Sequence, residues 1–75
     1  MAQYSDINDS AKITFPVPAE LEAHMKKAEE YDLAGRWWRY SDEIQLIEEL
    51  AEKAVADGKI TALQKEIIGA RYRMK

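Results

Sequence analysis

The chain offers few side chains that could carry out catalysis or bind a metal. Its 75 residues include one histidine, His24, and no cysteine. A zinc site needs several converging donors, and the carboxylates of Glu20 and Glu22 do not lie one helical turn from His24. Nucleophilic catalysis has no support either, because there is no thiol and no strained Gly-x-Ser-x-Gly turn. We therefore expect no metal and no cofactor, and place His24 on the flank of a helix.

A cluster of acidic residues, Glu48, Glu49 and Glu52, is the other candidate for catalysis. In a helix such a cluster is usually a solvated face. Paired catalytic carboxylates would need a cleft around them, and a domain of this size rarely encloses one. The sequence thus predicts a protein that is not an enzyme.

The peptide RWWRY is the most distinctive stretch of the chain. Tryptophan and arginine are enriched at the energetic centres of protein interfaces, and an exposed indole between guanidinium groups can stack on a partner. The alternative is that the indoles fill the core of a small domain. We expect Trp37 to face the core and Trp38 to point outward, so that Arg36, Trp38 and Arg39 contact a protein partner or a second copy of the chain.

The elements that must position this peptide begin with a central amphipathic helix over residues 36–57. Its apolar residues recur every three or four positions: Trp37, Tyr40, Ile44, Ile47, Ala51 and Ala54, widened by Leu46, Leu50 and Val55. At about 100° per residue they cover about half of the helix circumference, which requires two neighbouring helices. A helix beginning only at Ser41, with RWWRY as a loop, is the alternative; the phase of Trp37 and Tyr40 favours the continuous helix.

Two flanking helices follow from end signals and from apolar periodicity. The first expected helix covers residues 18–34. It begins at Pro18, which suits a first helical position, and ends before Gly35. Residues 61–73 begin with Thr61 and Gln64, the spacing of a capping box. The expected buried stripes are Leu21, Met25, Ala28 and Tyr31 in the first helix and Leu63, Ile67, Ala70 and Met74 in the third.

The N-terminal part of the chain contains no helical pattern. Residues 1–10 are polar and are expected to form a flexible tail. Over residues 11–17, three apolar side chains alternate with polar ones, and Pro16 and Pro18 exclude a helix, so we expect an extended arm anchored by Phe15. Any strand here would be an edge strand. The predicted fold is all-α: one domain, residues 11–75, forming a small antiparallel three-helix bundle with an extended N-terminal arm.

Charge and composition indicate where in the cell the protein is expected. The net charge is −3, but residues 58–75 carry five basic side chains and one acidic side chain. Basic residues in a last helical turn complement the helix dipole, which accounts for most of this asymmetry. No stretch approaches the 18 or so apolar residues that span a membrane, and a small domain without disulfides is typical of a reducing compartment. We expect a cytoplasmic protein without membrane contact.

The run KITFPVPAELEAHMKKAEEYD, followed by GRWWRYSDEIQLIEEL, resembles the ribbon-helix-helix family of DNA-binding proteins over residues 11–55. The resemblance implies a strand that pairs across a dimer, with Lys12, Thr14 and Pro16 reading the major groove. It leaves the third helix without a counterpart, and two acidic helices would repel phosphates. The favoured hypothesis is a non-catalytic interaction or accessory module; a dimeric DNA-binding regulator using Lys12 and Thr14 is the alternative.

Overall fold

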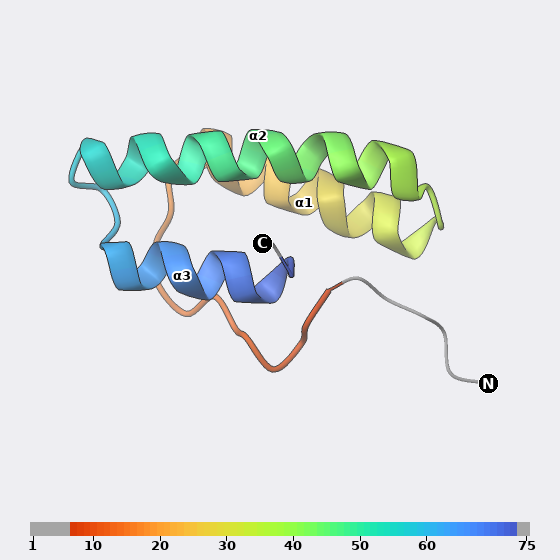
Figure 1. Cartoon of the computed structure of the whole chain (residues 1–75), viewed down its shortest axis with the longest axis horizontal. Helices are drawn as coiled ribbons and strands as arrows, with labels where there is room; N and C mark the ends of the chain where they lie inside the picture. The colour runs from red at the N-terminus through yellow and green to blue at the C-terminus, as the bar shows by residue number, and fades with distance from the viewer. Residues whose placement is uncertain (1–6, 74–75) are drawn as a thin grey trace.

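The computed structural model describes residues 7–73 and confirms the all-α bundle (Figure 1). Three helices, α1 (Ala19–Leu33), α2 (Trp37–Ala56) and α3 (Ala62–Arg71), follow one another in antiparallel order. None of the residues 7–73 belongs to a β-strand. The helix ends lie within one or two residues of those expected, and α2 is continuous through both tryptophans.

Local sequence explains where each helix begins and ends. Gly35 and Gly58 lie in the turns that follow α1 and α2. Their φ angles are +72° and +74°, a left-handed conformation that glycine reaches without steric cost. At the start of α3, the Thr61 hydroxyl accepts a bond from the Gln64 backbone while the Gln64 side chain accepts one from the Thr61 backbone. This reciprocal pair is the expected capping box, and it satisfies two backbone donors that a helix start leaves free.

The core lies along the central helix, where both flanking elements meet it. The buried apolar residues of α1 and α2 are Leu21, Met25, Ala28, Tyr40, Ile47, Ala51 and Ala54. Ile47 and Ala51 are almost fully buried, as the apolar stripe of α2 requires. Leu46, at one side of that stripe, is 40% exposed, so the buried arc is narrower than the sequence indicated.

The third helix packs in a different phase from the predicted one. Its only buried residue is Ile68, followed by Tyr72 at the C-cap, whereas Leu63 is 67% exposed and Ala70 is also exposed. The predicted stripe was therefore wrong for Leu63 and Ala70, and Met74 lies outside the described residues. At 100° per residue, Leu63 sits about 140° from Ile68, too far round the helix to reach the core.

The N-terminal segment packs against the bundle from Ile7 onward. Ile7 is only 9% exposed, and the Asn8 backbone N–H donates to the carbonyl of Arg71 at 2.7 Å, so the packed part of the chain begins earlier than Ala11. Residues 1–6 of the expected tail lie outside the described part. Along the arm, Ile13, Phe15 and Val17 pack against the core. The alternation seen in the sequence thus sorts the arm into an inner apolar side and an outer side.

Candidate interaction surface

The turn between α1 and α2 forms an exposed corner at one end of the bundle (Figure 1). All of residues 33–39 are exposed, and we call this segment the tryptophan corner. Trp37 is 66% exposed, Trp38 51% and Leu33 75%. Large apolar side chains clustered in water are uncommon on a monomer, and they mark contact surfaces.

The exposure of Trp37 corrects the expectation that it faces the core. Trp37 keeps the spacing of the apolar stripe, but at 100° per residue it lies about 80° from Ile47, at the edge of the buried arc. Its end of α2 also extends beyond the end of α3 (Figure 1), so no third helix covers it. Trp38 points outward, as a continuous helix requires.

The two indoles pack against each other. Their ring centroids lie 5.7 Å apart with an interplanar angle of 88°, an edge-to-face arrangement. Such pairs gain about 0.5–1.5 kcal/mol beyond area burial, which restricts the freedom of the two rings. The corner therefore presents a partly ordered aromatic surface. Ordering it on binding costs less entropy than ordering two freely rotating indoles would.

Arginines lie on both sides of the indoles in the sequence. Arg36 and Arg39 lie within the corner, and Arg73, just after α3, is also exposed. None of these three guanidinium groups forms an ion pair with another residue in the described range. The first turn of α2 has no acidic residue, and the α2 N-cap residue Arg36 provides no side-chain cap. The positive end of the helix dipole thus adds to the arginine charges.

A shallow groove runs from the corner towards the end of α3, and we call it the corner groove. It has a volume of about 310 Å³ and is lined by Trp37, Tyr40, Ser41, Ile44, Tyr72 and Arg73. Tyr40 and Tyr72 are buried, whereas Trp37, Ser41 and Arg73 are exposed. The groove therefore has aromatic residues within it and a cation at its rim.

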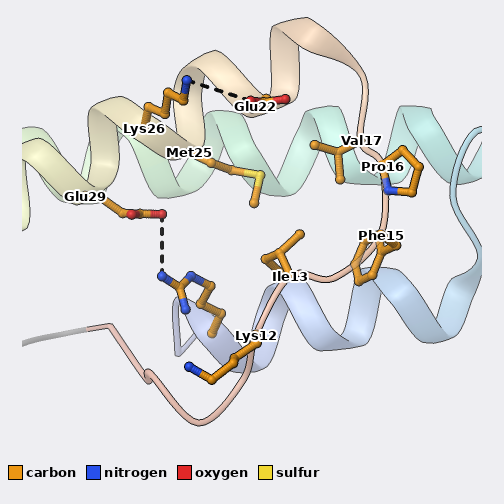
Figure 2. Close-up of a pocket in the computed structure, with 10 residues that line it drawn as sticks. Lys12, Ile13, Phe15, Pro16, Val17, Glu22, Met25, Lys26 and Glu29 are labelled. Carbon is orange, nitrogen blue, oxygen red and sulfur yellow. Dashed lines mark ion pairs between the residues drawn. The ribbon is translucent and has the colours of Figure 1, made fainter.

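A larger groove of about 510 Å³ lies between the arm and α1 (Figure 2). Its apolar residues come from the arm and from Met25, and its charges are mostly paired. Glu22 lies 3.8 Å from Lys26, and Glu29 lies 3.7 Å from the Arg71 guanidinium (Figure 2). Arg71 also donates to the carbonyl of Ala11 at 3.1 Å. The bond from Arg71 to Ala11 holds the arm in place. Because most of the charged groups in this groove are paired with one another, the groove offers little unpaired polarity to a ligand.

His24 has a partner that the sequence reading missed. Its Nδ1 lies 2.6 Å from Oε2 of Glu43 on α2, and Glu43 is 9% exposed. The signal was present, because Glu43 falls about 40° from Ile47 on the helical wheel, within the buried arc. Within residues 7–73, no three side chains of the metal-binding types come together. The pair is thus a link between α1 and α2.

The structure defines an all-α three-helix bundle with an extended arm and one exposed aromatic and cationic corner. Across the described residues, no helix is long and apolar enough to cross a membrane. No protein-family model, curated protein or solved structure matches this chain.

Proposed function

We propose that this protein is a non-catalytic interaction module that binds another protein through the tryptophan corner. The observation that carries the proposal is the joint exposure of Trp37 and Trp38, beside arginines that have no ion pair among the described residues. A small bundle that needed its indoles for stability would bury them, since each large side chain contributes about 1.5–3 kcal/mol on burial. Keeping both in water leaves them available to a partner, with Arg36, Trp38 and Arg39 as the predicted contacts.

Quantitative affinity capture tests this proposal. The immobilised protein is compared with Trp38→Ala and with Leu63→Ala, which removes another exposed apolar side chain far from the corner on α3. Partners of the corner are lost from Trp38→Ala and retained by Leu63→Ala, and chemical cross-links map to residues 33–39. Capture that is equal for all three proteins places the contact elsewhere.

The alternative function, a dimeric DNA-binding regulator, draws on the arm. Lys12 and Thr14 are exposed on its outer side, as readers of a DNA groove would be. This function predicts a dimer and duplex binding that weakens steeply with salt and is lost in a Lys12→Ala/Thr14→Ala variant. If the protein is a monomer and does not bind duplex DNA at low salt, the DNA-binding function is excluded and the interaction module remains.

A further inference from the structure

The tryptophan corner combines an aromatic surface with cations that have no ion pairs among the described residues, and this combination specifies a partner. Arg36 and Arg39 flank the indoles, and Arg73 lines the corner groove beside Trp37. Of the seven other basic residues in the described range, three form ion pairs with glutamates: Lys26, Lys65 and Arg71. Positive charge is therefore left available at the corner, although the chain as a whole carries −3.

We infer that the tryptophan corner binds an acidic peptide segment, which places a large apolar side chain in the corner groove and carboxylates against Arg36, Arg39 and Arg73. This inference rests on the proposed function and names its partner. Guanidinium groups suit carboxylates because they form paired, charge-assisted hydrogen bonds. Trp37 and Ile44 supply the apolar walls of the groove.

The position of the groove explains why a short segment fits it. α3 ends at Arg71, and the N-terminal turns of α2 extend past that end (Figure 1). Trp37 and Ser41, in those turns, are exposed, and the groove lies between them and the residues that follow α3. A segment a few residues long is enough to cover it, in the manner of a peptide that docks an anchor side chain into a pocket.

Charge argues against a second copy of the chain as the occupant. A symmetric dimer uses the same patch on both subunits, so the three arginines of one chain would face the same three of the other. Like charges brought together in an interface cost binding free energy. An acidic segment instead neutralises them, and its association should be fast and sensitive to salt.

Selection from a random displayed peptide library, with the full chain as the target, tests the inference. We expect enriched peptides to contain aspartate or glutamate next to leucine, phenylalanine or tryptophan. Their affinity, measured by fluorescence anisotropy, should fall about tenfold in an Arg36→Glu/Arg39→Glu variant, since rim charges contribute to both rate and affinity. The matched control is Lys59→Glu, an exposed charge reversal at the opposite end of α2, which should bind normally.

The outcomes separate this inference from the proposed function. Enriched peptides without acidic residues that still require Trp38 overturn the acidic partner and leave the interaction module standing. Peptides that bind Trp38→Ala as tightly as they bind the original protein overturn both the acidic partner and the proposed interaction module. A library that yields no binder overturns the peptide partner. Dimerisation that depends on Trp38, seen by analytical ultracentrifugation, makes a second copy the occupant and also overturns the inference.

Discussion

Nδ1 of His24 lies 2.6 Å from Oε2 of Glu43, and this contact joins α1 to α2 within a core that is otherwise apolar. Glu43 is the one charged residue in the described part of the chain that is buried. A buried carboxylate is costly unless it is hydrogen-bonded, so the histidine compensates a group that the position would not otherwise tolerate. The pair therefore fixes how the two helices align as well as how strongly they hold together.

Removing one partner of this pair should destabilise the bundle. We expect Glu43→Ala to lower the free energy of unfolding by about 1–3 kcal/mol, because it leaves a partly buried imidazole without its partner. Urea denaturation followed by circular dichroism measures the change. Glu49→Ala, which removes an exposed carboxylate from the same helix, should change stability by no more than about 0.5 kcal/mol. Equal effects from the two variants would show that the contact contributes nothing.

Much of the fold could be predicted because local signals and periodicity agree along α1 and α2. Leu21, Met25 and Ala28 share one helical face, and Gly35 marks the turn that follows. The capping box at Thr61 is equally local, since both of its hydrogen bonds span only three residues. Patterns of this kind depend little on the rest of the chain, and a sequence therefore reveals them.

The errors occur where distant parts of the chain decide the outcome. In α3, Ile68 and Tyr72 lie beside the predicted stripe, and they are the residues that are buried. Tyr72 then donates to Glu29 of α1, and the carbonyl of Arg71 accepts from the arm. At the corner, Trp37 has the correct spacing for burial, but it begins α2, and that end of α2 extends beyond the end of α3 (Figure 1). Helix length and long-range hydrogen bonds set both results, and neither is encoded in a local period.

The phase of α3 can be checked by two truncations. Ile68→Ala should lower the free energy of unfolding by about 2–5 kcal/mol, because Ile68 is fully buried and its truncation leaves a cavity. Leu63→Ala should cost less than about 0.5 kcal/mol, because Leu63 is mostly in water. If Ile68→Ala does not fold, the milder Ile68→Val, costing about 0.5–1.5 kcal/mol, takes its place. If Leu63→Ala lowers the free energy of unfolding more than the change at Ile68 does, the stripe through Leu63 is the buried one.

The exposed indoles make a spectroscopic prediction. Fluorescence emission of the native protein should be red-shifted, and iodide should quench nearly all of it, because both tryptophans contact water. Trp38→Phe should lower the intensity while leaving the free energy of unfolding within about 0.5 kcal/mol of the original, as for other surface changes. Blue-shifted emission that iodide does not quench would mean that the corner is closed in solution.

Tyr72 should make the stability of the bundle depend on alkaline pH. Its hydroxyl donates to Oε2 of Glu29 at 3.0 Å. Burial, and then the negative charge of Glu29, raise the pKa of Tyr72 above its ordinary value of 10.0. The folded protein therefore binds this proton more tightly than the unfolded chain does, and its contribution is fully present below about pH 10. As the pH rises further, the unfolded tyrosine ionises first, and stability should fall by up to about 1.4 kcal/mol per pH unit.

Replacing Tyr72 with phenylalanine isolates this effect from the other titrating groups. At neutral pH, Tyr72→Phe should cost about 0.5–1.5 kcal/mol, the usual net contribution of one hydrogen bond. Because phenylalanine cannot ionise, the deficit of the variant should shrink as the pH rises above 10 and the two stability curves converge. Leu63→Ala, an exposed change on α3 that involves no ionisable group, serves as the control and should run parallel to the original protein. Parallel curves for Tyr72→Phe as well would show that the Tyr72 proton is held no more tightly in the folded state.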